Sequence, residues 1–383
     1  MSDPSKDAQK KIIKYIDEKN ELYDHIISFL DNSSDEEEDY FFQKYKEDDQ
    51  EEFKHFVQLI ASIANNYHRN ETFLPKIFMI IDNYKDQIKQ TFSNSDIFDI
   101  FKDNKLIILY MIEKNILEID RNIFLQMESK IEKNGNRYLH FFYPELKEFL
   151  GEERTKEIEE ELLSLDPKIL DDFDLKRHKG ENDSYISNLI RNDLVEDFVA
   201  FVTQSATQLD SRIRHSIFET NLFLIENNTT LIEYSAFYGS YQIFQFLQIE
   251  NAKLNPSLWL YAIHSQNADL IHLLESLNIA NAKTKEKYIE YLAESIKCHH
   301  KNFTRYITDT FLSQDDDVRN REEIISAIFQ SHNYSLFRDN FIKKEFYYLC
   351  SNQYNKLVNF HMEKKEKEFN EKISRQINHN SFK

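Results

Sequence analysis

Glycine and proline are scarce in this chain, and their scarcity limits the folds and activities that the sequence can encode. The 383 residues include only 4 glycines and 5 prolines. Sandwiches and barrels need many turns with positive φ, whereas helical assemblies need few, so the composition favours helices throughout. Gly135 and Gly151, the closest pair of glycines, are 16 residues apart. Phosphate-binding loops need at least two glycines within about six residues, so nucleotide enzymes that use such loops are excluded.

Cysteine, long apolar runs and basic charge are also limited. The 2 cysteines form no CxxC motif, and residues 1–7 contain no apolar stretch that would indicate a secretory signal, so the sequence predicts a cytoplasmic protein. No run of 18 apolar residues occurs, which predicts that the chain does not span a membrane. The net charge of −19 repels phosphate backbones, so we expect no direct nucleic-acid partner. Residues 341–383 are basic and are interpreted as a solvated end helix.

An internal helix-turn-helix pattern is the most informative feature that is present. Its clearest copy runs from Thr230 through Gly239 to Leu247, with a small residue at Ser235 and an apolar face in the second half. Similar stretches occur at 262–274 and 295–307, which are offset by 33 residues from each other. Such a period indicates stacked two-helix units, because each unit is too small to bury its apolar face alone. The repeat therefore predicts an all-α solenoid.

The same residues resemble the ankyrin repeat. Its first helix opens with Thr-Pro-Leu-His-x-Ala, and its second helix carries an apolar stripe. Matching positions in the clearest copy are Thr230, Ile232, Ala236, Gly239, Ile243 and Leu247, whereas Leu231 and Glu233 replace the usual proline and histidine. The stretches 217–225 and 257–264 are similar to a large family of ankyrin-type proteins of unknown function that is expanded in parasitic protists. The resemblance implies a scaffold without a known activity.

Composition shifts suggest four parts of the chain. We expect an N-terminal helical region over 1–150 that includes degenerate repeats or precedes them, and an acidic connector over 151–184. Degenerate ankyrin-like repeats then occupy 185–365, and a charged tail occupies 366–383. Residues 145–174 contain twelve acidic and four basic residues, which favours a solvated connector. The acidic stretch 31–39 predicts a mobile loop.

Helical spacing predicts further elements in the N-terminal region. Apolar residues fall on one helix face over 12–30, 53–64 and 77–88, and Pro75 is placed in a first turn. Residues 106–115 resemble the outer helix of an ankyrin unit. Trp259, the single tryptophan, is expected to pack between repeat units rather than to bind a ligand.

Metal and catalytic motifs have little support. Cys298, His299 and His300 are adjacent, but neighbouring helical residues point about 100° apart and cannot converge on one ion. No second Cys or His pair has zinc spacing, and HExxH does not occur. We therefore expect no metal, no cofactor and no enzymatic activity.

The positions just before each predicted turn are the candidate partner-binding residues. Because they vary chemically from unit to unit, they suit a recognition surface on the concave face of a scaffold, although Phe237 also suits a core. The predicted partner is another protein, and the acidic chain favours a basic one. Self-assembly, or an enzyme site in the N-terminal region, remains open as an alternative. The candidate residues are Phe237, Tyr238, His264, Ser265, Lys297 and Cys298.

Overall fold

The computed structural model is helical in all the parts of the chain that it describes. Those parts are residues 4–32, 41–42, 49–68, 72–129, 138–277, 279, 282–313, 321–334, 356–360, 362–363, 365–366 and 369. Within them no strand occurs, and β-type pairing is limited to an isolated bridge between Arg212 and Thr230. Across the same ranges, no helix combines the length and apolar character that crossing a bilayer requires. The predicted all-α class is thus confirmed for this part of the chain.

The chain divides into two compact units. The terminal unit joins both ends of the sequence, Met1–Tyr45 and Thr284–Lys383, and the central unit is Lys46–Lys283. Helices of the terminal unit are α1 (Pro4–Asn32), α18 (Lys285–Lys297), α19 (Lys301–Thr310) and α20 (Glu322–Gln330).

The central unit contains two groups of helices. The first group is α3 (Gln50–Asn66), α4 (Phe73–Asn83), α5 (Lys85–Thr91), α6 (Asn94–Phe101), α7 (Lys105–Glu113), α8 (Arg121–Ser129), α9 (Tyr138–Leu165) and α10 (Phe173–Lys179). The second group is α11 (Tyr185–Arg191), α12 (Val195–Gln204), α13 (Leu222–Glu226), α14 (Leu231–Tyr238), α15 (Tyr241–Ile249), α16 (Leu258–Ser265) and α17 (Ala268–Ser276).

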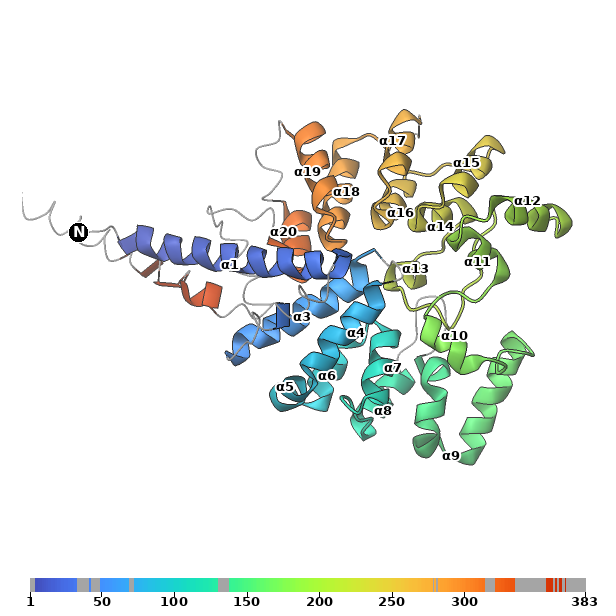
Figure 1. Ribbon diagram of the computed structural model, residues 1–383, viewed down its shortest axis with the longest axis horizontal. Coiled ribbons are helices and arrows are strands. Elements are labelled where there is room, and N and C mark those ends of the chain that lie inside the picture. Colours follow the sequence, from blue (N-terminus) through green and yellow to red (C-terminus); the bar gives the residue numbers. More distant parts are fainter. Residues whose placement is uncertain are drawn as a thin grey trace, which may run out of the picture. The chain divides into compact units, whose positions relative to one another are not determined.

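Helices of the second group form pairs that stack in chain order. Figure 1 shows α11–α12, α14–α15 and α16–α17 side by side. The first helices of the pairs contact one another, α11 with α14 and α14 with α16, and α12 contacts α15 among the second helices. This arrangement agrees with the two-helix units that the sequence pattern predicts at 230–247 and 262–274.

A single residue with left-handed backbone makes the turn within each pair. The predicted positive φ at Gly239 is confirmed at 69°, but other residue types take the same conformation elsewhere, at Asp193 (48°) and Gln266 (53°) in the central unit and at His299 (57°) and His332 (54°) in the terminal unit. Gln266, His299 and His332 follow one another at intervals of 33 residues. The period seen in the sequence is therefore also a period of backbone geometry.

Side chains link successive turns of the central unit. The Ser240 hydroxyl donates to the carbonyl of Ile190, at 2.5 Å, and the Asn267 amide donates to the carbonyl of Gly239, at 3.2 Å. Ser240 and Asn267 each follow the left-handed residue of their own turn, and each reaches back to the preceding pair. These bonds satisfy carbonyls at helix ends, which have no partner within their own helix. The turns thus form a hydrogen-bonded row along the stack.

The first helices of the pairs are buried along most of their length. In α14, all residues from Leu231 to Phe237 are buried, and in α16 Trp259 is fully buried, as predicted. The short helix α13 covers part of this surface, because its Phe223 ring lies 5.9 Å from the Phe237 ring and 4.2 Å from the His264 ring. The chain therefore covers these first-helix positions with its own residues.

Residues 151–184, predicted as a connector, lie inside the central unit. Gly151 (φ 74°, ψ 170°) breaks α9 into two arms that run side by side (Figure 1). His140 of the first arm lies 2.8 Å from Glu161 of the second. Arg177 of α10, which is buried, donates two hydrogen bonds to Glu145 of α9, at 2.7 and 2.9 Å. The division into compact units differs from the sequence boundaries because these contacts anchor the segment, and solvation of the segment as a whole is not observed.

In the terminal unit the first helix packs against α18 and α19. The Tyr23 hydroxyl donates to the carbonyl of His299, at 3.1 Å, and Lys301 pairs with Asp24 at 2.8 Å. These contacts join residues that are more than 270 positions apart, so sequence periodicity alone gave no indication of them. The predicted mobile loop lies outside the described residues from position 33 onward, and of the predicted tail only residues 366 and 369 are described.

Candidate functional site

An irregular segment, residues 205–221, interrupts the stacked pairs of the central unit between α12 and α13. Its backbone is tied to the chain that enters α14. Ile213 N–H donates to the carbonyl of Thr229, at 2.8 Å, and Leu231 N–H donates to the carbonyl of Ser211, at 3.1 Å. The segment therefore keeps a defined path without helical periodicity, and it forms one wall of each of two cavities.

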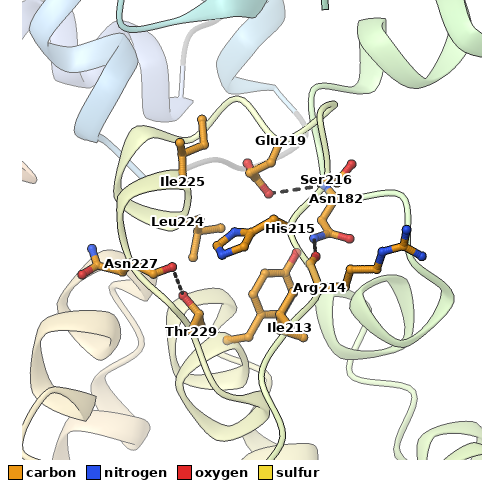
Figure 2. Close-up of a pocket in the computed structure, with 11 residues that line it drawn as sticks. Asn182, Ile213, Arg214, His215, Ser216, Glu219, Leu224, Ile225, Asn227 and Thr229 are labelled. Carbon is orange, nitrogen blue, oxygen red and sulfur yellow. Dashed lines mark hydrogen bonds between the residues drawn. The ribbon is translucent and has the colours of Figure 1, made fainter. Parts of the chain in front are cut away.

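Glu219, a buried acid, organises the end of this segment. Its carboxylate accepts backbone N–H groups from Asn182, Thr220 and Asn221 at 3.3, 3.0 and 2.8 Å. Asn182 in turn donates its side-chain amide to the carbonyl of Arg214, at 2.7 Å. Figure 2 shows these groups around a cavity of about 20 Å³. That volume suits one water molecule and no larger ligand.

A second cavity, of about 290 Å³, lies on the other side of Asn182. Its walls come from the end of α9, from the approach to α11 and from the irregular segment. Arg214 bridges two of these walls, because its guanidinium donates to the carbonyl of Leu165 at 2.7 Å. The lining residues are Leu165, Asp166, Ile169, Asn182, Asp183, Ser184, Tyr185, Arg214, His215, Ser216, Ile217 and Phe218.

The second cavity has an apolar interior and a polar rim. Ile169, Ile217 and Phe218 are buried, whereas Leu165 and Tyr185 are 42% and 57% exposed. The rim carries Asp166 and Asp183, and Asp183 accepts the hydroxyl of Ser216 at 2.7 Å. An arrangement of apolar walls with a few polar groups is typical of binding sites.

A buried polar network supports the approach to α11. The Arg191 guanidinium donates to the hydroxyl of Tyr234 at 2.9 Å and to the carbonyl of Asn182 at 2.8 Å, and it pairs with Glu181 at 3.0 Å. Burial raises the pKa of the Tyr238 hydroxyl well above its ordinary value, so this group is neutral at pH 7. The network fixes the loop 180–184 that walls both cavities.

Two of the predicted partner-binding residues are packed together beneath α13. The rings of Phe237 and His264 are stacked 5.0 Å apart, and both side chains are buried. Ser265 is also buried, and its hydroxyl donates to the carbonyl of Ala262 at 2.8 Å. These three residues contribute to packing within the central unit.

The other three candidates differ in exposure. Tyr238 is half-buried, and its ring lies 4.8 Å from that of Tyr234. In the terminal unit, Lys297 is partly exposed and pairs with Glu294 at 3.3 Å. Cys298 is buried, and burial raises the pKa of its thiol well above the ordinary value, so the thiol is neutral at pH 7. Partner binding stays a prediction for all six, and the accessible side chains among them are those of Tyr238 and Lys297.

Sequence reasoning did not locate the 290 Å³ cavity. The lining residues come from three separated stretches, 165–169, 182–185 and 214–218, none of which has a motif of its own. The signal that was available is Gly180. Its φ is 64°, and a Cβ there would lie 2.8 Å from a methyl carbon of Leu106. A glycine followed by a polar stretch indicated a turn, but not that distant chain segments approach one another at it.

No protein-family model matches the chain, and the searches of curated proteins and of solved structures found no similar protein.

Proposed function

We propose that the chain is a protein-binding scaffold built from ankyrin-like helix pairs. The observation that carries this proposal is the row of linked turns in the central unit. Stacked pairs present successive turns at a regular spacing, and repeat proteins use such extended surfaces to bind partners. The resemblance to ankyrin-type proteins supports the same function and, like the solenoid itself, belongs to the proposal.

Residues at the turns are accessible and chemically varied. Asn192 and Leu194 are exposed at the first turn, Tyr238 is half-buried at the second and Gln266 is half-buried at the third. This sequence of amide, aliphatic and aromatic groups suits recognition of one particular partner surface. By contrast, the first-helix positions Phe237 and His264 are covered by α13, so the proposed surface is formed by the turns.

Charge favours a basic partner. Glu196 and Asp197 are exposed in the first turn of α12, next to Leu194, and the whole chain carries a net charge of −19. Opposite charge speeds association and discriminates against acidic partners. Cytoplasmic location and the lack of a nucleic-acid partner are parts of the same proposal.

Affinity capture from the native cells tests this function. We expect a captured protein to bind the chain, and Leu194→Asp to weaken that binding at least tenfold, about 1.4 kcal/mol, because the exposed side chain at the first turn becomes charged. Ile249→Asp is the matched control, since Ile249 is 69% exposed at the other end of α15. Light scattering separates the alternative, because self-assembly would give large particles without a foreign partner. Capture of no protein, or equal weakening by both variants, contradicts the proposal.

A further inference from the structure

The 290 Å³ cavity is the largest described space in the central unit that no side chain fills. Pockets for drug-sized ligands have volumes of about 300–1,000 Å³, so this cavity is at the lower limit for a small molecule and suits one large side chain. Its buried walls are apolar, and the exposed rings and methyl groups of Tyr185 and Leu165 extend the apolar surface to its mouth. An apolar group that enters it gains contacts on several sides.

Acidic residues surround the mouth of this cavity. Leu165, Asp166 and Ile169 belong to the stretch 145–174, which contains twelve acidic and four basic residues. Exposed acids in this stretch include Glu152, Glu153, Glu157 and Glu160 of the second α9 arm, and Asp171, Asp172 and Asp174 beyond it. Charges of one sign along a surface raise the local concentration of oppositely charged groups. The occupant of the cavity should therefore carry positive charge outside the apolar group.

Arg214 does not reverse this preference. Its guanidinium is held at the rim by the carbonyl of Leu165. Opposite it, the carboxylate of Asp166 accepts only the backbone N–H of Lys168, at 2.9 Å, among the bonds described for it. Asp166 thus retains acceptor capacity toward a cation at the mouth.

We propose that the cavity binds an apolar side chain of a partner protein, presented by a linear segment with Lys or Arg on both sides of that side chain. The inference rests on the proposed scaffold function and adds a place and a chemistry to it. The apolar group fills the space between Ile169, Ile217 and Tyr185, and the basic neighbours face the acidic stretch 145–174. Anchors of this kind, desolvated in a pocket and surrounded by polar contacts, supply much of the affinity of protein interfaces.

A phage-displayed library of random dodecapeptides, selected on the full chain at low salt, provides the probe. We expect enrichment of peptides in which a large apolar residue has two or more basic neighbours. A synthetic, fluorescently labelled copy of the enriched peptide then measures affinity by anisotropy. Replacement of its apolar residue by glycine should weaken binding at least tenfold. Enrichment of acidic peptides, or of none, overturns the proposal.

Variants of the chain locate the binding site. Ile169→Trp, which fills the cavity, should weaken the enriched peptide at least tenfold, and Tyr185→Ala, at an exposed position that leaves the core intact, should weaken it about fivefold. Asp166→Asn should weaken it two- to threefold, whereas Asp269→Asn, an exposed acid on α17, should have no effect. Circular dichroism and thermal unfolding confirm that each variant is folded. Unchanged affinity in the folded Tyr185 and Ile169 variants overturns the proposal.

The two proposals fail in different ways. If a captured partner binds Ile169→Trp and the native chain equally well, the cavity proposal is wrong and the scaffold function stands. If no partner is captured although the basic peptide binds the cavity, the scaffold function fails while the site is real.

Discussion

The stacked helix pairs and the irregular segment 205–221 lie next to each other in the central unit, but different interactions fix their backbones. In the pairs, each turn repeats one left-handed geometry and one link to the preceding turn, as at Ser240 and Asn267. In the irregular segment, individual polar groups such as Glu219 replace that regularity. A repeated geometry tolerates several residue types at each turn, whereas a unique arrangement depends on particular residues. Substitutions should therefore affect the two regions differently.

The largest expected effect is at Gly180, where the irregular segment approaches α7. Gly180→Val would place a Cβ 2.8 Å from Leu106 and 2.9 Å from the Thr220 hydroxyl, in addition to the strain of a positive φ. We expect a loss of about 2–5 kcal/mol in the free energy of unfolding, measured by chemical denaturation. Gly151→Val is the control, because it has positive φ but no atom within 4 Å of the new Cβ, and it should cost less. Equal losses would mean that close approach at Gly180 is unimportant.

The next effect tests whether His264 is a packing residue of the stack. His264→Ala removes a buried ring that contacts Phe223 and Phe237, so it should cost about 2–4 kcal/mol of unfolding free energy. His272→Ala on α17, where the side chain is 67% exposed, should change stability by less than about 0.5 kcal/mol. Thermal and chemical unfolding measure both variants. A His264 variant as stable as the His272 variant would place His264 on an accessible surface, as the sequence analysis predicted.

Two equivalent turns allow a test of tolerance within the stack. Gly239→Val should cost about 1–3 kcal/mol, since a β-branched residue is strained at positive φ. At the corresponding position of the next pair, Gln266→Gly relieves strain and should stabilise by up to about 1 kcal/mol. Unfolding free energies of the two variants are compared with that of the native chain. If Gln266→Gly is destabilising by more than Gly239→Val, the two turns are not equivalent.

The smallest effect concerns the turn at His299 in the terminal unit. Burial lowers the pKa of His299 to about 3, whereas an unfolded histidine titrates near 6.5. Between these values the unfolded chain binds the additional proton, so stability falls as the pH falls, by up to about 1.4 kcal/mol per pH unit. At pH 5.5 we expect a loss of about 1 kcal/mol relative to pH 7.

Replacement of the ring identifies the origin of that pH dependence. His299→Gln should reduce the slope of unfolding free energy against pH between 6.5 and 3, whereas His178→Gln, at an exposed position on α10, should leave it larger. Denaturation curves at several pH values measure the slope. Identical slopes in the two variants would assign the effect to other groups.

The sequence predicted features that depend on local pattern. Helix pairs at 230–247 and 262–274, positive φ at Gly239 and burial of Trp259 all follow from apolar spacing and residue type. Left-handed Gln266 and His299 were not predicted, because neither residue type favours that conformation and the stack imposes it.

Features that depend on distant contacts were not accessible in the same way. Phe223 covers Phe237 and His264 although it belongs to another helix pair's approach, so the exposure of those residues could not be deduced from their register. The 290 Å³ cavity likewise combines three stretches that are far apart in the sequence. Single-sequence patterns describe faces of helices, and they do not show which segment covers a face.

Hydrogen–deuterium exchange with a captured partner tests the central claim, that the row of turns binds protein. The turns at 192–194, 238–241 and 266–268 should exchange more slowly in the complex than in the chain alone, and the opposite end of α15, around Ile249, should exchange equally in both. Protection confined to the end of α15, or no change at any of the three turns while the partner is bound, would contradict the account.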